Sequence, residues 1–253
     1  MITSLRHGLF NAAHAIGYTV MPNWRVERHP QAVYLRKLFR LLGIDCVLDV
    51  GANIGQYHDF LREEVGFKGK IVSFEPIPTH VDALRERSVE DSEWSIEGYA
   101  LGAVAGNLAL NVMSSTTFSS FLAPKPSTPK CFAESNEVRE QITVPIKRLD
   151  EVLPRLLETL RFRSPYLKLD TQGFDLEVIR GALQCLSQVR ALQTEASVRP
   201  IYEGMPDFAT VQRALEDLGF QPSGIFPNNE GHFPLLIDFD FHMINGRFHN
   251  ESA

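Results

Sequence analysis

The stretch VLDVGANIGQYHDFL, residues 47–61, constrains the fold of this chain more than any other segment. It opens with the mostly apolar run VLDV, as expected of a buried parallel strand, and the residues from Asn53 onward suit a helix. Gly51 and Gly55 fall in the tight turn between the two. Such a corner is typical of the first strand and helix of an open α/β sheet, at the edge where ligands bind.

Strand and helix patterns alternate on both sides of this corner. We expect strands at 46–50, 70–74, 95–99, 165–170 and 190–195, and helices at 30–42, 54–65, 78–88, 175–186 and 207–218. Near the end of the sequence, GFQPSGIF and FPLLIDFDFHMIN are expected to pair as an antiparallel hairpin. This order predicts the fold class α/β: a Rossmann-like, doubly wound sheet of mostly parallel strands with an antiparallel C-terminal hairpin, in three αβα layers.

The alternating pattern occupies residues 44–245, which we predict to be the core of a single domain spanning 1–253. An N-terminal helical extension, 1–43, precedes this core and includes an amphipathic helix expected at 4–16. That helix is too short to cross a bilayer, and we expect it to pack on the domain or on a partner subunit rather than on a membrane surface. A Ser/Thr/Pro-rich insert at about 114–140 interrupts the core, and long irregular segments of this kind are often functional.

Charge and cysteine usage narrow the classes of function. The 253 residues carry a formal net charge of −6 without any run of five basic residues, so nucleic acid is not an expected partner. The three cysteines are odd in number and form no CxxC pair. This disfavours a disulfide framework and a zinc site, and it favours a reducing, cytoplasmic location.

The glycine spacing of the first corner indicates which ligand it binds. The corner has the pattern D-x-G-x-x-x-G from Asp49 to Gly55, whereas a dinucleotide site requires G-x-G-x-x-G for its pyrophosphate. S-adenosylmethionine carries no phosphate, and an acidic residue such as Asp49 can meet its cationic amino-acid part. Gly51 lets the backbone approach the ligand closely, and Asn53 lies in the same turn.

The second strand supports the same ligand. It ends in IVSFEP, so Glu75 and Pro76 lie at its tip, where a carboxylate can accept hydrogen bonds from both ribose hydroxyls. Taken singly, Asp49 can be a helix cap and Glu75 an exposed strand-end acid, and nicotinamide sites use such an acid as well. The two acids together, beside a glycine turn, favour S-adenosylmethionine as the cofactor.

Several motifs together resemble the FkbM-type S-adenosylmethionine-dependent methyltransferases. VLDVGANIGQY and IVSFEPIP are similar to the two cofactor motifs of the family, and ITVPIKRLDEVL, TEASVRPIYEG and LIDFDF resemble later segments. YLKLDTQGFDLEVIRGA is the most specific match, close to the family signature K-x-D-x-(E/Q)-G-(F/Y)-(D/E). The resemblance extends over about 44–240. It implies a methyltransferase domain that O-methylates a hydroxyl group of a sugar, glycan or polyketide-type acceptor.

Three residues at the ends of the fourth and fifth strands are candidates for catalysis: Lys168, Asp170 and Glu195. Lys168 and Asp170 point to the same side of a strand, so the lysine either keeps Asp170 ionised or belongs to a structural ion pair. Sheet order would place Glu195 beside Asp170. Asp170 can then act as a general base, a metal ligand or an acceptor for the ammonium group of the cofactor. The two carboxylates suit a divalent cation such as Mg²⁺, or one base and one orienting group.

Acceptor contacts are expected from the insert and from a later loop. Ser119 and Ser120, in FSSFL, can line the acceptor, although a polar loop explains them equally well. Tyr202, in RPIYEG, can cover the acceptor or simply fill space under a loop. Of the other polar residues near the site, we expect His58 on the surface of the first helix and Asp175 as the cap of a later helix.

Other functions are alternatives. A catalytically silent S-adenosyl-binding scaffold subunit would keep the same cofactor corner. A nucleic-acid N-methyltransferase is disfavoured, because residues 170–173 are DTQG where such enzymes typically carry (Asp/Asn/Ser)-Pro-Pro-(Tyr/Phe), and the glycine spacing disfavours a nicotinamide-dependent reductase. The expected partner is a small-molecule or glycan acceptor, with no nucleic acid and no stable membrane insertion. Whether the chain forms a homo-oligomer is open.

Overall fold

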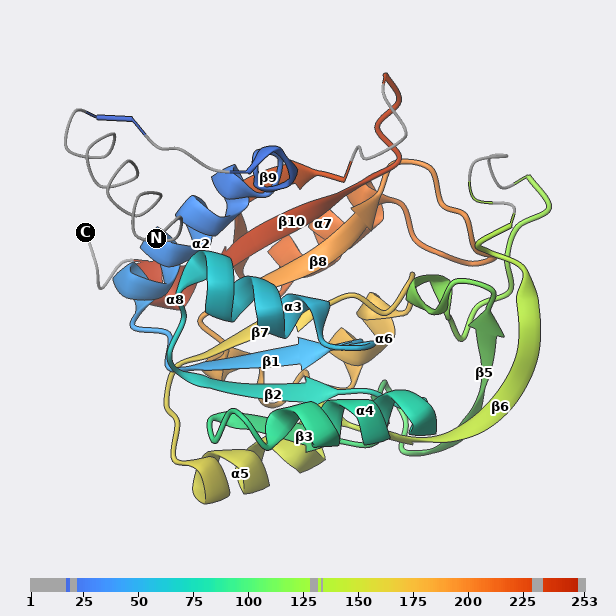
Figure 1. The fold of residues 1–253 in the computed structure, drawn as a ribbon, viewed down its shortest axis with the longest axis horizontal. Helices are drawn as coiled ribbons and strands as arrows, with labels where there is room; N and C mark the ends of the chain where they lie inside the picture. Colours follow the sequence, from blue (N-terminus) through green and yellow to red (C-terminus); the bar gives the residue numbers. More distant parts are fainter. Residues whose placement is uncertain (1–16, 19–21, 128–131, 133, 229–233, 250–253) are drawn as a thin grey trace, which may run out of the picture.

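The computed structural model describes residues 17–18, 22–127, 132, 134–228 and 234–249, and the helix expected at 4–16 lies outside them. This part of the chain contains one sheet of seven strands and one of three (Figure 1). Apolar cores lie on both faces of the larger sheet. The predicted fold class, a mostly parallel α/β sheet in three layers, is confirmed.

The seven-stranded sheet has the order β3-β2-β1-β7-β8-β10-β9. Its strands are β1 (Cys46–Val50), β2 (Lys70–Phe74), β3 (Trp94–Glu97), β7 (Pro165–Leu169), β8 (Ala191–Ser197), β9 (Phe220–Pro227) and β10 (Asp238–Asn245). The first five in the sheet order run parallel, and β10 pairs antiparallel with β8 and β9, so the expected hairpin is present. The chain progresses outward from β1 in both directions, which makes the carboxyl edge beside β1 the expected ligand site.

Helices cover both faces of this sheet. One apolar core contains residues of α2 (His29–Leu42), α3 (Gln56–Asp59), η2 (Phe60–Val65) and α4 (Pro78–Ser88). The opposite core contains residues of α5 (Leu149–Leu160), α6 (Asp175–Arg180) and α7 (Phe208–Asp217). In Figure 1, α3 and α4 lie in front of the sheet and α7 lies behind it. The shorter helical segments are η1 (Asn23–Arg25), η3 (Thr116–Phe118), η5 (Leu186–Gln188) and α8 (Gly246–His249).

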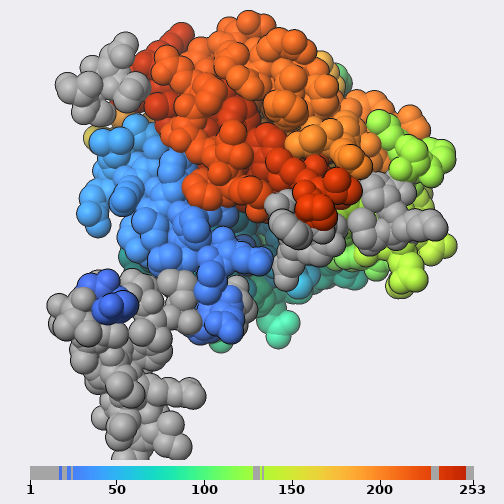
Figure 2. Space-filling model, turned by 90° about the horizontal axis from the view of Figure 1, so that it is seen from above, coloured from blue at the N-terminus to red at the C-terminus, as the bar shows by residue number. Residues whose placement is uncertain are grey.

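Helix α2 attaches the N-terminal extension to the sheet. Its buried residues Leu35 and Phe39 belong to the first of these cores, and Gly43, with φ 61°, ends the helix. The hydroxyl of Tyr34 donates to Ser223 Oγ at 2.7 Å, which fastens α2 to β9. Figure 2 shows the described part of the extension, in blue, against the C-terminal strands, in orange and red. This part of the extension is therefore folded onto the core.

Strands on either side of the insert form the second sheet, with the order β4-β6-β5. Its strands are β4 (Ala100–Leu101), β5 (Gly106–Met113) and β6 (Val138–Lys147). In Figure 1, β5 and β6 form a long curved ribbon at the end of the main sheet. Isolated bridges pair Asn111 with Ser120 and Pro124 with Tyr202. These bridges hold part of the Ser/Thr/Pro-rich segment in a defined position.

Two predicted helices differ from those observed. The helix expected at 54–65 begins at Gln56, because Asn53 and Gly55 have φ values of 51° and 93°, and its second half is a π-helix. The helix expected at 175–186 ends at Arg180. A Cβ at Gly181 would lie 2.0 Å from the carbonyl oxygen of Gly102, so close packing of two backbones replaces the last helical turns. Within the described residues, the other expected strands and helices occur within two residues of their predicted bounds, except that the last strand begins at Asp238, inside the segment FPLLIDFDFHMIN.

Candidate functional site

The turn after β1 brings the backbones of two neighbouring strands into contact. Gly51 has φ 82°, and a Cβ added to it would lie 2.0 Å from the carbonyl oxygen of Asp170, at the end of β7. Only glycine fits there, for conformational and steric reasons alike. Asn53 also has a positive φ, and its N–H donates to Glu75 Oε2 at 2.8 Å. Backbone strain of this kind in a non-glycine residue is frequent at functional sites.

Glu75 lies where the sequence predicts a ribose-binding acid. Its side chain is buried, and its Oε1 accepts a hydrogen bond from the N–H of Ile77 at 2.9 Å while Oε2 accepts from Asn53. His80 Nδ1 lies 3.6 Å from Oε1. A carboxylate has about four acceptor positions, so Glu75 can still accept hydrogen bonds from a ligand. The two backbone donors fix its orientation.

A row of buried polar side chains crosses five strands on the sheet face that α2 and α3 cover. In register, the row consists of Ser73, Asp49, Lys168, Gln193 and His242. All five are at most 4% exposed. Ser73 Oγ donates to Asp49 Oδ2 at 3.1 Å, and Lys168 Nζ lies 3.0 Å from Asp49 Oδ1. The buried polar groups therefore partner one another, as their burial requires.

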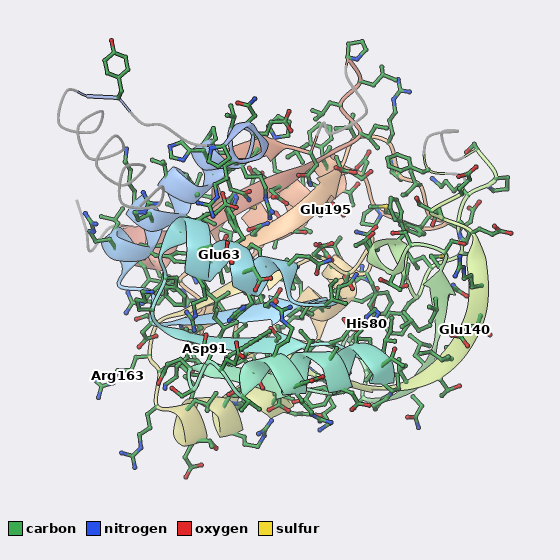
Figure 3. All side chains as sticks on the ribbon, in the orientation of Figure 1. Glu63, His80, Asp91, Glu140, Arg163 and Glu195 are labelled. Carbon is green, nitrogen blue, oxygen red and sulfur yellow. The ribbon has the colours of Figure 1, made fainter. Side chains whose placement is uncertain are left out.

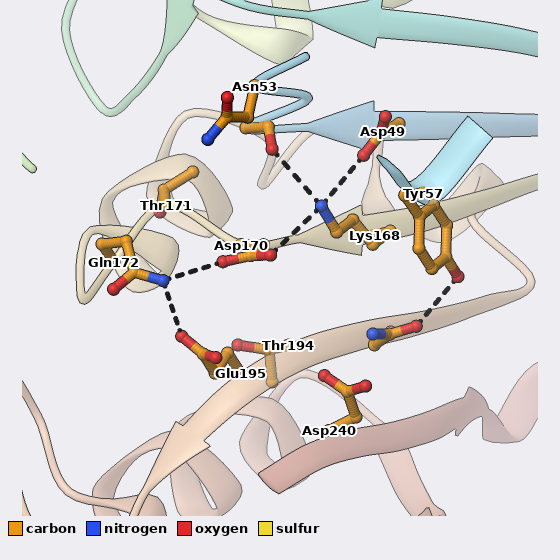
Figure 4. A network of polar contacts seen from close by, with 12 residues as sticks. Asp49, Asn53, Tyr57, Lys168, Asp170, Thr171, Gln172, Thr194, Glu195 and Asp240 are labelled. Carbon is orange, nitrogen blue, oxygen red and sulfur yellow. Dashed lines mark hydrogen bonds and ion pairs between the residues drawn. The ribbon is translucent and has the colours of Figure 1, made fainter. Parts of the chain in front are cut away.

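Lys168 connects this buried row to the open edge of the sheet. Its Nζ lies 3.4 Å from Asp170 Oδ2 and donates to the carbonyl oxygen of Gly51 at 3.4 Å (Figure 4). Burial alone would lower the pKa of Lys168, but the charges of Asp49 and Asp170 raise it above its ordinary value. A permanently charged lysine thus holds the turn after β1 against the end of β7. Lys168 therefore forms a buried structural ion pair with Asp49 and also lies within ion-pair distance of Asp170.

Asp170 and Glu195 lie side by side at the ends of β7 and β8. The side-chain amide of Gln172 bridges them, since its Nε2 donates to Asp170 Oδ1 at 3.1 Å and to Glu195 Oε2 at 2.9 Å (Figure 4). Burial raises the pKa of Glu195 well above its ordinary value, and the nearby charges of Asp170 and Asp238 add to the effect. A carboxylate with a raised pKa is a better proton acceptor near neutral pH than an ordinary one.

Gln172 is fixed in one orientation by its surroundings. It has φ 52°, and its backbone carbonyl oxygen accepts a hydrogen bond from Ser120 Oγ at 2.7 Å. The hydroxyl of Tyr202 lies 3.1 Å from Gln172 Oε1 and 2.7 Å from the carbonyl oxygen of Phe118, to which it donates. Contacts on the amide oxygen side direct the NH₂ group towards the two carboxylates. Ser120 and Tyr202 therefore act on the site through Gln172.

Another carboxylate, the partly buried Asp240 on β10, approaches the site from the next strand and pairs in register with Glu195. Gln31 Nε2 of α2 donates to Asp240 Oδ2 at 2.7 Å and lies 3.2 Å from His242 Nε2. Burial raises the pKa of Asp240 and lowers that of His242 to about 3, so the imidazole is neutral. Tyr166 OH lies 2.7 Å from its Nδ1. These contacts place the start of α2 over the end of the sheet.

These elements enclose a cavity of about 300 Å³. Its lining comes from seven parts of the chain: Arg28 of the extension, Val50 to Asn53, Gln56 and Tyr57 at β1, Phe74 to Ile77 and His80 at β2, Ala100, Leu101 and Leu110 of β4 and β5, Thr116, Thr117, Ser119 and Phe121 of the insert, Lys168 and Asp170 to Gln172 at β7, and Gln193, Glu195, Asn228 and Asp240 of the C-terminal strands. Figure 3 labels two of them, Glu195 on β8 and His80 at the start of α4. The cavity thus lies at the carboxyl edge, beside β1.

Eight of the residues predicted for the site line this cavity. They are Gly51, Asn53, Glu75, Pro76, Ser119, Lys168, Asp170 and Glu195. Four others, Asp49, Gly55, Ser120 and Tyr202, lie behind the lining. Asp49 is fully buried against Lys168, and Gly55 packs against the side chains of Trp94 and Leu84. The strand ends and the glycine turn identified nine of these residues, and the insert and a later loop gave Ser119, Ser120 and Tyr202. These patterns did not distinguish contact with a ligand from support of the residues that make it.

The prediction that His58 lies on the helix surface is wrong. His58 is 9% exposed and stacks on Trp94, with ring centroids 3.6 Å apart. Its Nδ1 lies 3.0 Å from Asp59 Oδ1 and its Nε2 lies 3.0 Å from Asp91 Oδ2. The imidazole joins α3 to the loop before β3, and it does not line the cavity.

The prediction that Asp175 caps a helix is also wrong. No side chain caps the start of α6, and Asp175 is its first residue. Its Oδ1 accepts hydrogen bonds from the N–H and the hydroxyl of Thr171, and its Oδ2 accepts from Thr194 Oγ1 at 2.5 Å. Burial raises the pKa of Asp175. The buried carboxyl group ties the turn after β7 to β8 and so fixes the spacing of Asp170 and Glu195.

Sequence reasoning missed Arg28, Gln172, Asn228 and Asp240 as residues of the site. Asp240 carried a signal, because an acid in the apolar run FDF requires a buried partner. Gln172 carried a weaker one, as part of the signature turn. Arg28 and Asn228 reach the cavity only through the packing of α2 and β9, which no local pattern specifies.

The carboxylate pair does not fit the divalent cation expected as an option. Both N–H groups of the Gln172 amide point at Asp170 and Glu195, and Lys168 offers a third donor. A cation at this position would be repelled by the Lys168 ammonium group and would compete with these donors for the carboxylate oxygens. Among the described residues, no group of three or more His, Cys, Asp or Glu side chains is arranged to hold a metal ion. We therefore derive no step through a metal.

The sequence model of the FkbM methyltransferase domain matches residues 49–222, which is more than half of the chain. The chain therefore belongs to the FkbM methyltransferase family, as its motifs indicated, and its cofactor class is S-adenosylmethionine. The cavity fits this cofactor, because Glu75 offers free acceptor positions for a ribose and the glycine turn at Gly51 lines the same cavity. No curated protein matches the sequence. Within the described residues, every helix is too short or too polar to span a bilayer.

Solved structures resemble the chain in outline. A SAM-dependent methyltransferase from Aquifex aeolicus has 15% identity and a TM-score of 0.42, over 88% of this chain and 94% of the other. Fibrillarin from Aeropyrum pernix, with bound S-adenosylmethionine, has 12% identity and a TM-score of 0.48, over 85% and 74%. Magnesium protoporphyrin IX methyltransferase from Synechocystis has 10% identity and a TM-score of 0.45, over 94% and 91%. The family assignment does not depend on these similarities.

Proposed function

We propose that the protein transfers a methyl group from S-adenosylmethionine to a hydroxyl group of a sugar, glycan or polyketide-type acceptor. The observation that carries the proposal is the pair Asp170 and Glu195, which lines the cavity and shares the amide donor of Gln172. An alcohol is a poor nucleophile while it keeps its proton, so an O-methyltransferase needs a positioned proton acceptor. The pair supplies one at the edge of the sheet where the cofactor is expected.

The residues that would hold the cofactor lie along β1, β2 and β7. Glu75 accepts hydrogen bonds from the ribose hydroxyls, and the turn at Gly51 lies against the amino-acid part. Asp170, the more exposed carboxylate of the site, with 39% side-chain exposure, faces the cationic part of the cofactor. Bound S-adenosylmethionine would supply a methyl group carried on a sulfonium. The rest of the cofactor would leave as a neutral thioether.

Glu195 is the residue that takes the proton of the acceptor. When the acceptor hydroxyl receives the methyl group that bound S-adenosylmethionine would supply, the Glu195 carboxylate would take the hydroxyl proton. Burial and neighbouring acids raise the pKa of Glu195, which brings its basicity closer to that required at neutral pH. Gln172 holds the Glu195 carboxylate in place by donating a hydrogen bond to its Oε2. The rate of transfer then depends on how well the acceptor oxygen, the methyl carbon and the sulfur are aligned.

The lining of the cavity supports a neutral, hydroxyl-rich acceptor. Asp170, Glu195 and Asp240 present carboxylate oxygens, which accept hydrogen bonds from hydroxyl groups and repel an anionic acceptor. Thr116, Thr117 and Ser119 of the insert add hydroxyl groups to the same lining. These groups favour a sugar-like acceptor over a carboxylic or phosphorylated one.

The cofactor part of the proposal is tested by titration calorimetry with S-adenosylhomocysteine. Glu75→Ala should weaken binding about ten- to a hundredfold, because a hydrogen bond to a charged group contributes about 1.5–3 kcal/mol. Glu86→Ala removes an exposed acid of α4 that lies outside the lining, and it should bind as the wild type does. Wild-type protein that binds no S-adenosylhomocysteine would overturn the proposal.

The acceptor part is tested by a screen for release of S-adenosylhomocysteine with neutral sugars, polyketide alcohols, amines and sugar phosphates. Turnover confined to hydroxyl acceptors, and lost in Glu195→Gln, supports the proposal. Methylation of amines in place of alcohols contradicts it. Tight cofactor binding without turnover on any acceptor class would favour the scaffold alternative.

A further inference from the structure

The cavity is rich in carboxylates, yet the expected cofactor itself carries one. Glu75, Asp170, Glu195 and Asp240 all line it. The amino-acid part of S-adenosylmethionine has an ammonium group and a carboxylate, and an unpaired carboxylate in this lining would be repelled. The cofactor carboxylate therefore needs a cationic partner at the edge of the cavity.

Lys168 does not meet that need, although it lines the cavity. Its side chain is 5% exposed and its ammonium group lies between Asp49 and Asp170. Arg28 is the other lysine or arginine of the lining among the described residues. It makes no ion pair with any described residue, and it lies at the start of α2, next to the helix that follows the Gly51 turn.

The Arg28 side chain packs on Phe60. Its guanidinium carbon lies over the ring, 4.7 Å from the centroid, in a cation–π arrangement. Burial raises the pKa of Tyr57 well above its ordinary value, and the positive charge of Arg28 offsets part of that rise. The next turn of α2 is fixed by the hydrogen bond from Gln31 to Asp240. A guanidinium stacked on one face keeps its N–H groups free at the edge for a carboxylate, which it can bind through two parallel hydrogen bonds.

We infer that Arg28 is a cofactor-binding residue that pairs with the carboxylate of S-adenosylmethionine. The N-terminal extension thereby contributes directly to the cofactor site. This inference rests on the proposed function, because it assumes that S-adenosylmethionine occupies the cavity. It assigns the carboxylate end to the extension, whereas Glu75 serves the ribose at the other end.

The test is a cycle of two ligands and two proteins, measured by titration calorimetry at low salt. The ligands are S-adenosylhomocysteine and its decarboxylated analogue, S-(5′-adenosyl)-3-thiopropylamine, which lacks only the carboxylate. Arg28→Gln should weaken the binding of S-adenosylhomocysteine at least about tenfold and the binding of the analogue less than about twofold. Only the first ligand loses a charge-assisted pair. Arg40→Gln, an exposed change at the other end of α2, should affect neither.

Each other outcome has a distinct meaning. Equal weakening of both ligands, or no change in either, overturns the role of Arg28 while leaving the proposed function in place. Failure of both ligands to bind the wild type overturns the proposed function itself. A loss of affinity for the methyl acceptor alone, with both cofactor analogues bound as before, would assign Arg28 to the acceptor and overturn the inference. Arg28→Met keeps the packing on Phe60, and it carries the same test if Arg28→Gln does not fold.

Discussion

Two pairs of charged side chains lie two residues apart along the central strands, and they differ in charge and in burial. Asp49 and Lys168 are sealed beneath the turn after β1, with side-chain exposures of 0% and 5%. Asp170 and Glu195 lie at the strand ends, where Asp170 is 39% exposed and a neutral amide joins the two acids. The sealed pair combines opposite charges and holds the backbone, whereas the open pair combines like charges and is available for chemistry.

The difference shows that neighbouring positions at the end of a strand can have separate roles, one in stability and one in the chemistry of the site. Opposite charges in a buried pair stabilise each other only while both are present, so the pair is sensitive to the loss of either member. Like charges in the open pair raise the proton affinity of the site, which costs stability and, under the proposed function, supplies the base. Lys168 contacts both pairs, and it couples the support of the turn to the position of Asp170.

The largest effect is expected from breaking the sealed pair. Lys168→Met leaves Asp49 buried without its cation, and it should lower the free energy of unfolding by about 3–5 kcal/mol, measured by urea denaturation. Lys70→Met is the matched control, because Lys70 pairs with Glu93 near the surface and should cost at most about 1 kcal/mol. Equal losses in the two variants would show that the buried pair has no special role.

The next effect concerns the open pair. Glu195→Gln keeps the shape of the side chain but removes the proton acceptor, and it should lower kcat about a hundred- to a thousandfold with the unfolding free energy unchanged or raised. Glu203→Gln, an exposed change on the following loop, serves as the control. A comparable loss in Asp170→Asn, with Glu195→Gln active, would move the role of base to Asp170.

A smaller effect is expected from the bridge between the two acids. Gln172→Ala removes the donor shared by Asp170 and Glu195, which raises the proton affinity of the pair and moves the acidic limb of the kcat profile to higher pH. We expect kcat at neutral pH to fall about tenfold and the affinity for S-adenosylhomocysteine to change less than about threefold. An unshifted pH profile would restrict Gln172 to a structural role. Gln184→Ala, at an exposed position, is the control.

The smallest effect is a gain in stability. Burial raises the pKa of Asp238 to about 6, and the charges of Asp240 and Asp170 contribute. The folded chain therefore binds this proton more tightly than the unfolded chain, and its stability falls as pH rises from about 4 to 6. Asp238→Asn should raise the unfolding free energy by about 1–2 kcal/mol at pH 7 and change nothing below about pH 4. A gain that is independent of pH would refute this origin, and Asp217→Asn is the exposed control.

The fold and the cofactor end of the site could be predicted from the sequence because both depend on local patterns. Strands β1 and β2 end where their apolar runs end, and the glycine turn and Glu75 follow directly. The parallel order then brings Asp170 and Glu195 together. Asp49 is buried and supports the turn after β1, whereas Asp170 is exposed to the cavity. This difference depends on how deeply each carboxylate lies below the protein surface. Spacing along a strand does not specify that depth.

The other end of the site depends on contacts between distant segments. Asp240 reaches it because β10 is inserted between β8 and β9, and Gln31 lies 209 residues away from it in sequence. His58 looked like a surface residue because its helical position faces outward in an ideal α-helix, but the chain before β3 covers it. Tertiary packing of this kind leaves no periodic signal along the chain.

The segment shared with the family, residues 49–222, has a consequence for how relatives of this chain diverge. Three residues of the cavity lining lie outside it: Arg28 before the segment, and Asn228 and Asp240 after it. Substitutions of Asn228 and Asp240 can reshape one wall while Arg28, the glycine turn, Glu75 and the carboxylate pair stay intact. Two proteins that share the matched segment can therefore inherit one cofactor and still select different molecules to modify.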